Sequence, residues 1–380
     1  MIYLDNCSTT MPLDEVCSVM DQSMHDEWGN PSSMHHLGIA AEKQIILCKK
    51  ELAEILACEP AEICFTSCGT ESINMALKSF WDAYPRAGKH MITSMGEHKA
   101  TLDTCRYLEK KGIEIDYLPL SNSGNIDFGF LKEKIRPDTT LMSFIHVNNE
   151  TGAILDAGEL VQLRNRYFPD VLIHLDCVQS FGKYGKRIGQ LGVDFASISA
   201  HKIHGPKGIG IFFHKKSAKV SPLIHGGGQQ KNLRSGTESL ALIKGMTIAA
   251  REAYKNLNID YFYVTALNKL LLCNLNRLKV DYRSNSPLNS TPYILNISFP
   301  GVKAQTLLHT LDNFGVFVST ISACSSRKQI QSHVLLAMGL DPALIGSSIR
   351  ISFNRFNTQD EIVEAAEKIK ESLDILLHRK

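Results

Sequence analysis

The chain has 380 residues and is almost neutral, with 41 lysine and arginine residues against 39 acidic ones and a formal net charge of +2. Hydrophobic residues make up 44% and charged residues 21%, which is ordinary for a globular protein, and the length predicts two domains. Because the charges balance, there is no electrostatic reason to expect a nucleic acid or a membrane surface as partner.

The N-terminal segment MIYLDNCSTTMP lacks the basic stretch and apolar run of a signal peptide. Nowhere do about 18 apolar residues follow one another, which argues against a membrane-spanning helix. A cytoplasmic location is therefore expected. In that reducing compartment the ten cysteines are expected to be free thiols. Cys64 and Cys68 lack a second pair of ligands, so no metal site is predicted.

From about residue 12 to residue 254, apolar strands alternate with amphipathic helices. The expected strands are 63–66, 90–93, 113–118, 141–146, 171–175, 195–199 and 208–213, and the expected helices include 41–57, 71–80, 100–111 and 157–167. Such alternation is typical of a mostly parallel sheet covered on both faces by helices. Since the last two strands lie too close in sequence for a helical crossover, one antiparallel edge is expected.

After a helix expected at 239–254, the pattern changes. Strands are expected at 293–299, 316–319 and 349–353, and helices at 303–311, 329–338 and 359–377, which predicts a smaller α+β domain. The predicted division is an N-terminal arm at 1–15, a large domain at 16–255 and a small domain at 256–380. Ligands of open α/β sheets bind beyond the carboxyl ends of the strands, so the loops there are expected to carry the site.

The first such loop, FTSCGTES, has the features of an anion site. Gly69 allows close backbone approach, and the free N–H groups of the following helical turn favour a negative charge. Thr70 adds a hydroxyl. An ordinary helix cap would explain the same residues.

The loop SISAHKIHGPKG places Lys202 just past a buried strand. A partly buried amine becomes neutral more easily and can form a Schiff base with an aldehyde. Ser199 and His201 leave the same strand end and could hold a phosphate. A solvated basic loop is the alternative.

Further polar residues follow the other strands. Asp176, in HLDCVQS, is placed to pair with a protonated pyridine nitrogen, although it could equally cap the next segment. His98 and Asn149 also follow strands, where structural residues are common. Taken together, an anion nest, an aspartate, a lysine and a histidine at successive strand ends match the needs of one bound pyridine aldehyde phosphate.

The sequence resembles the cysteine desulfurases, enzymes of the pyridoxal-phosphate (PLP)-dependent fold type I within the class V aminotransferase superfamily. The resemblance covers nearly the whole chain. Its motifs stand in the family's order: GNPSSMH, FTSCGTES, EHKATLDTC, HVNNETG, HLDCVQS, SAHKIHGPKG, HGGGQQKNLRSGTE and SACSS. It implies a fold type I large domain with a mostly parallel seven-stranded sheet and a smaller α+β C-terminal domain.

The resemblance also implies a role for each matching residue. Lys202 would link PLP covalently, Asp176 would pair with the ring nitrogen, Gln179 would bond the ring hydroxyl, and His98 would stack over the ring and take part in proton transfer. The phosphate would be bound by Gly69, Thr70, Ser199, His201 and Thr237, the last reaching from a neighbouring subunit. A homodimer with shared sites is therefore implied.

For the substrate, Asn149 beside the cofactor and Arg350 would hold the carboxylate of L-cysteine, and Cys324 would be the acceptor thiol. The implied reaction yields L-alanine and a persulfide on Cys324. The sulfur would pass to an acceptor protein, either an iron–sulfur scaffold or a tRNA-thiolation relay. A selenocysteine lyase, a class V aminotransferase and a non-catalytic PLP-fold scaffold of a sulfur-transfer complex remain as alternatives.

This chain departs from the family's pattern at a few positions. Cys68 stands at a usual glycine position of the phosphate nest, and Ile321 stands where a smaller residue usually precedes the SAC motif. The N-terminal DNNATT pattern reads DNCSTT here. Since the spacing around Cys324 is kept, these changes are expected to alter rate and partner choice more than reaction type.

Overall fold

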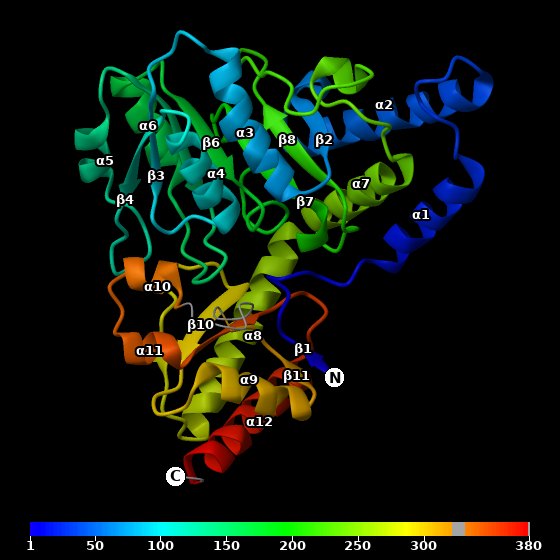
Figure 1. Ribbon diagram of the computed structural model, residues 1–380. Coiled ribbons are helices and arrows are strands. Elements are labelled where there is room, and N and C mark those ends of the chain that lie inside the picture. The colour runs from blue at the N-terminus through cyan, green and yellow to red at the C-terminus, as the bar shows by residue number, and fades with distance from the viewer. Residues whose placement is uncertain (321–330, 379–380) are drawn as a thin grey trace.

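The structure is a computed structural model that describes residues 1–320 and 331–378 (Figure 1). Its centre is a seven-stranded sheet of order β2–β8–β7–β6–β5–β3–β4, in which only β8 is antiparallel to its neighbours. The strands are β2 (Ile63–Thr66), β3 (His90–Ser94), β4 (Glu114–Leu118), β5 (Thr139–Ile145), β6 (Leu172–Asp176), β7 (Phe195–Ser199) and β8 (Gly210–His214). The predicted mostly parallel seven-stranded sheet is confirmed.

The antiparallel strand does not lie at the edge that the sequence predicts. β8 pairs with β7 on one side and with β2 on the other, so β2 is the edge strand. All four residues of β2 are buried, so the backbone groups at its unpaired edge need hydrogen-bond partners from another part of the chain. The side-chain amide of Gln230 is such a partner: the Phe65 N–H donates to its Oε1 at 2.6 Å, and its Nε2 donates to the Phe65 carbonyl at 2.8 Å. A paired edge of this kind is protected from joining another chain.

Helices cover both faces of this sheet because successive strand residues point to opposite sides. On one face α3 (Gly69–Ala83) and α4 (Lys99–Glu109) pack with Met91, Leu141 and Phe212. On the other face the neighbouring residues Ile92, Met142 and Phe213 join a second cluster. The helices that contribute to this second cluster are α1 (Asp14–Asp26), α2 (His36–Leu56), α5 (Phe128–Lys134), α6 (Ala157–Tyr167) and α7 (Leu240–Lys255).

A second hydrophobic core surrounds a small antiparallel sheet of order β12–β10–β9, drawn below the large sheet in Figure 1. Its strands are β9 (Arg283–Ser284), β10 (Ile294–Ser298) and β12 (Ser348–Ser352), and its helices are α8 (Leu257–Arg277), α9 (Ala304–Asn313) and α12 (Gln359–His378). Short helices α10 (His333–Ala337) and α11 (Pro342–Gly346) form a separate small cluster. The domain limits at 15/16 and 255/256 stay a prediction.

Two features of this part of the chain are absent from the sequence-based prediction. The 21-residue helix α8 was not expected, and it is held by Val264, Leu267, Leu271 and Leu275, which recur every three or four residues and are fully buried. The N-terminal strand β1 (Ile2–Tyr3) pairs in parallel with β11 (Val316–Phe317), so the chain begins beside C-terminal elements (Figure 1).

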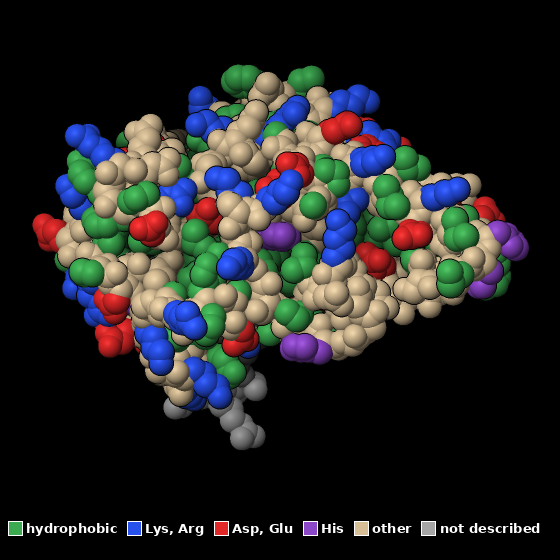
Figure 2. Space-filling view, turned by 90° about the horizontal axis from the view of Figure 1, so that it is seen from above, with side chains coloured by type: hydrophobic (Ala, Val, Ile, Leu, Met, Phe, Trp, Pro, Cys, Tyr) green, Lys and Arg blue, Asp and Glu red, His purple; other side chains and the backbone are tan. Residues whose placement is uncertain are grey.

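The surface carries both charge signs. Figure 2 shows lysine and arginine side chains interspersed with acidic ones on the face seen from above, in keeping with a net charge of +2. No helix within residues 1–320 or 331–378 has the length and apolar character needed to cross a membrane.

Candidate active site

A cavity of about 330 Å³ lies at the carboxyl ends of the parallel strands. Its lining includes ten of the predicted site residues: Gly69, Thr70, His98, Asn149, Asp176, Gln179, Ser199, His201, Lys202 and Arg350. They come from segments spread over more than half of the chain, and the parallel sheet brings them to one edge. Thr237 is exposed and does not line this cavity, and Cys324 lies outside the described residues.

One end of the cavity is suited to an anion. Helix α3 begins there at Gly69, and the preceding Cys68 makes no side-chain cap, so the first-turn N–H groups are free to bind a negative charge. A Cβ at Gly69 would come within 2.7 Å of Val178 Cγ2, so glycine is needed for this close approach. The hydroxyl of Ser199 is buried without a hydrogen-bond partner. These features fit a bound phosphate group.

Cys68 is accommodated in this nest. Its backbone is extended, with φ at −174°, which any residue can adopt, and its side chain lines the cavity. The thiol therefore replaces the family's usual glycine without backbone strain.

Lys202 lies at the end of β7 in a short 3₁₀ turn, as the sequence predicts for a strand-end lysine. Its ammonium donates to the carbonyls of Cys7 at 2.8 Å and Ser8 at 2.6 Å. Burial is the main cause that lowers the pKa of Lys202, and the nearby Arg350 guanidinium lowers it further. A lysine amine that loses its proton readily suits both covalent binding of an aldehyde and proton abstraction.

Asp176 is the last residue of β6 and is only 3% exposed. Its carboxylate accepts one hydrogen bond from the backbone N–H of Val178 at 3.0 Å. Burial raises the pKa of Asp176, while His98, the Val178 bond and Lys202 lower it. A buried carboxylate that lines a cavity with a single backbone donor has room for a cationic partner, such as a protonated pyridine nitrogen.

If the cavity binds PLP as the family resemblance implies, we expect Asp176→Ala to retain some PLP but to release the substrate Cα proton far more slowly. The ring nitrogen would lose its anionic partner, and one preorganised electrostatic contribution of this kind is worth about 10²-fold or more in rate. Solvent-deuterium exchange at Cα measures the step directly. Asp170→Ala, at an exposed position before β6, is the control. Near-normal exchange in Asp176→Ala would contradict the role.

His98 occupies the N-cap of α4, and its Nδ1 accepts a hydrogen bond from the Ala100 N–H at 3.1 Å. In the neutral ring the proton is therefore on Nε2. His98 is an exposed residue, but desolvation by its neighbours lowers the pKa of its imidazole; Asp176 partly opposes this shift, and the cation Lys202 lowers the pKa further. A neutral imidazole lining the cavity can stack on a ring and exchange a proton through Nε2.

The N-terminal arm supplies site residues to which the sequence assigned no role. Cys7 and Ser8 both line the cavity, and their carbonyls accept from Lys202. The Cys7 thiol donates to the Asn149 carbonyl at 3.2 Å, and the Ser8 hydroxyl accepts from Arg350 at 2.7 Å. The small polar run DNCSTT is the sequence signal that could have identified them.

Arg350 lies on β12 of the small sheet and is 7% exposed. It donates to the Asn149 carbonyl and to Asp5, both at 2.9 Å, and its Nε has no partner. The guanidinium thus joins the N-terminal arm, the Asn149 turn and the small sheet at the cavity. Its buried free N–H suits a ligand carboxylate.

The segment that contains Cys324 is flanked by described residues that contact the site. On one side, Ser319 and Arg350 exchange two backbone hydrogen bonds. On the other side, the Ser332 hydroxyl donates to the buried carboxylate of Glu150, and His333 Nε2 bonds the Glu97 carbonyl at 2.9 Å. The Glu150 carboxylate therefore anchors the start of α10 to the turn that carries Asn149. Apart from its place in the HVNNETG motif, nothing in the sequence singles out Glu150.

We expect Glu150→Gln to lower turnover by about fivefold to tenfold while leaving the KM for the substrate nearly unchanged. A hydrogen bond to a charged group contributes about 1 kcal/mol more than one to a neutral group, so the isosteric amide would hold Ser332 less tightly. Steady-state kinetics separate kcat from KM. The exposed Glu133→Gln is the control, and a change in KM alone would show that Glu150 acts on substrate binding instead.

The comparisons with known proteins agree with this site. The family model described as aminotransferase class-V matches residues 2–364. "Cysteine desulfurase IscS" of Buchnera aphidicola subsp. Baizongia pistaciae is 40% identical over 99% of this chain and 93% of that protein. "Cysteine desulfurase IscS" of Dictyoglomus turgidum is also 40% identical, over 98% of this chain and 95% of its own. A solved "NifS-like protein" superposes with a TM-score of 0.93 at 36% identity, covering 99% of this chain and all of that one.

The fold, the site and these matches show that the chain belongs to the aminotransferase class-V family, whose enzymes depend on PLP. Both curated relatives cover almost its full length. Within that family it belongs to the cysteine desulfurases.

Proposed function

We propose that this chain binds PLP and converts L-cysteine to L-alanine, leaving the sulfur as a persulfide on Cys324. The single observation that carries the proposal is the set of groups sharing one cavity. A lysine with a lowered pKa, a buried aspartate and a free helix N-terminus beside an unpartnered serine hydroxyl are complementary to the aldehyde, ring nitrogen and phosphate of PLP.

Separate residues of this chain would transfer the protons, orient the substrate and accept the sulfur. When bound, PLP supplies an electron sink for negative charge at the substrate Cα. Lys202 is the base that takes the Cα proton, and the neutral His98 holds or returns a proton at Nε2. Arg350 and Asn149 orient the substrate carboxylate. The sulfur bonds to the Cys324 thiolate as its bond to the substrate Cβ breaks and leaves its electron pair on that carbon. One proton added at Cβ and the proton returned to Cα complete alanine, and the transferred sulfur keeps its thiol proton in the persulfide.

Oligomeric state, acceptor and location belong to the same proposal. Thr237 is exposed on one chain, which supports its use in the site of a second copy and thus a homodimer. An iron–sulfur scaffold or a thiolation relay would receive the sulfur. The cytoplasmic location stays a prediction. Mixing inactive Lys202→Ala chains with inactive Thr237→Ala chains should change cofactor retention if sites are shared.

The function is tested by supplying the PLP-loaded protein with L-cysteine and measuring alanine and protein-bound sulfur. In a single turnover without reductant, the two products should form in equal amounts. Faster turnover of L-selenocysteine would favour a selenocysteine lyase. Consumption of a keto acid would favour an aminotransferase, and bound PLP without any turnover would favour a scaffold.

A further inference from the structure

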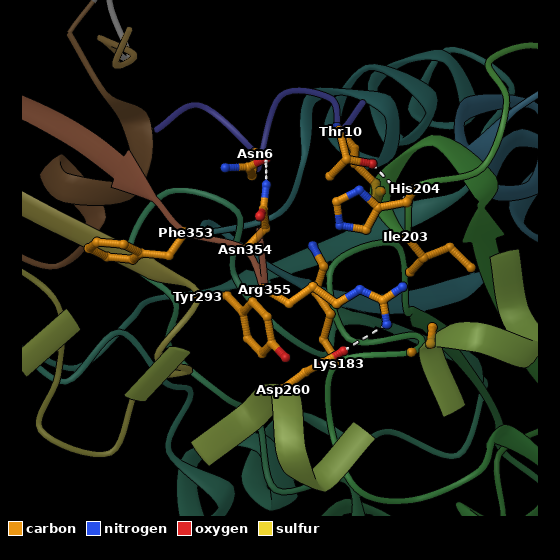
Figure 3. Close-up of a pocket in the computed structure, with 13 residues that line it drawn as sticks. Asn6, Thr10, Lys183, Ile203, His204, Asp260, Tyr293, Phe353, Asn354 and Arg355 are labelled. Atoms are coloured by element: carbon orange, nitrogen blue, oxygen red, sulfur yellow. Dashed lines mark hydrogen bonds and ion pairs between the residues drawn. The ribbon is translucent and has the colours of Figure 1, made fainter. Parts of the chain in front are cut away.

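Lys183 lies beside the active-site cavity and has no role so far. It follows β6 in the turn that carries Gln179 and lines a small cavity of about 30 Å³ together with Lys202. Figure 3 shows its surroundings, which include Asp260, Tyr293 and Arg355 from the C-terminal part of the chain. This small cavity therefore lies between turns that follow strands of the large sheet and residues that flank strands of the small sheet.

The ammonium of Lys183 has no carboxylate within ion-pair distance among the described residues. The nearby Asp260 is paired with Arg355 at 3.2 Å, a contact drawn in Figure 3. What Lys183 contacts is Gln179 Oε1 at 3.4 Å and, more distantly, the face of the Tyr293 ring at 5.8 Å. Burial lowers the pKa of Lys183 to about 8. An ammonium held in this way costs stability, so stability does not explain its presence.

The contact determines how the Gln179 amide is oriented. An ammonium only donates, so the amide must place its oxygen toward Lys183. At its other end, Nε2 donates to the Cys7 carbonyl at 3.0 Å, and this same carbonyl accepts from Lys202. Both partners therefore select one of the two possible amide orientations, and the second N–H of Nε2 remains for a ligand in the cavity that Gln179 lines.

We propose that Lys183 is a positioning residue: it holds the Gln179 amide with its N–H side available to the cofactor, so that Gln179 donates to the ring oxygen of PLP. This inference rests on the proposed function, because it needs PLP in the cavity. In the reversed orientation the amide oxygen would face the anionic ring oxygen and repel it. The charge of Lys183 also polarises the amide and strengthens the N–H donor at its other end.

The test compares Lys183→Met with the unchanged protein, both loaded with PLP. We expect affinity for PLP, measured by equilibrium dialysis, to fall about fivefold, as for one weakened hydrogen bond to a charged acceptor. A donor on the ring oxygen stabilises its anionic form. Without it, the pH midpoint of the visible absorption change should move upward by roughly half a unit. The melting temperature should be unchanged or higher, because methionine replaces an unpaired, half-buried charge.

A double-mutant cycle with Gln179→Ala shows whether Lys183 acts through the amide. If it does, Lys183→Met should add almost nothing to the loss caused by Gln179→Ala. The exposed Lys186→Met is the matched control and should behave like the unchanged protein. Fully additive losses, or an unshifted spectral midpoint in Lys183→Met, would overturn the inference. Failure of the unchanged protein itself to bind PLP would overturn the proposed function along with it.

Discussion

Replacing Lys202 with alanine is expected to remove the yellow colour of the PLP-loaded protein and to abolish turnover. Its amine is the one that the cavity places beside Asp176 and the phosphate nest, and its lowered pKa makes the reactive neutral form accessible. The loss combines the covalent link to the cofactor with a general base, and the base alone is worth about 10²- to 10⁴-fold. Borohydride reduction followed by peptide mass spectrometry should locate the cofactor on Lys202.

Lys207 provides the control for this experiment. It belongs to the same SAHKIHGPKG segment, but it is exposed and does not line the cavity. Lys207→Ala should therefore keep both colour and turnover. If the colour disappears in Lys207→Ala and persists in Lys202→Ala, the assignment within this segment is wrong.

Cys324→Ser is expected to keep the cofactor spectrum and bind cysteine, yet to release no sulfide and little alanine. A hydroxyl does not accept sulfur as a thiolate does, so the loss should reach at least about 10²-fold, comparable to removing one catalytic group. In the sequence the residue stands among small polar neighbours, with Arg327 and Lys328 close by to favour the thiolate. Unchanged protein treated with cysteine without reductant should carry one extra sulfur atom on the peptide containing Cys324.

Two other thiols make this experiment decisive. Cys7 and Cys68 both line the cavity, so either could in principle meet the substrate sulfur. Cys7→Ser and Cys68→Ser should retain persulfide formation on Cys324. An extra sulfur found on either of these cysteines, or full activity of Cys324→Ser, would overturn the assignment of the acceptor.

The sequence by itself determined the local elements and the main candidates. The short apolar runs predicted β2 and β7 with their observed limits, and the amphipathic helical pattern predicted α6. Their positions directly after predicted strands singled out residues such as Lys202 and Asp176. The carboxyl ends of parallel strands lie at one edge of the sheet, and ligands of open α/β sheets bind there. The limits of these elements and the polar residues that follow them depend on residues close together in the sequence, and the sequence alone therefore predicts them.

The tertiary structure decided what depends on contacts between distant segments. Whether β2 or β8 forms the edge depends on the burial of β2 and on Gln230, which is 165 residues away from Phe65. The carbonyl of Cys7 meets Lys202 only because the N-terminal arm crosses the cavity, and Glu150 meets Ser332 across 182 residues. No periodicity or spacing carries such pairings, because burial and hydrogen-bond geometry select them only when the chain is folded.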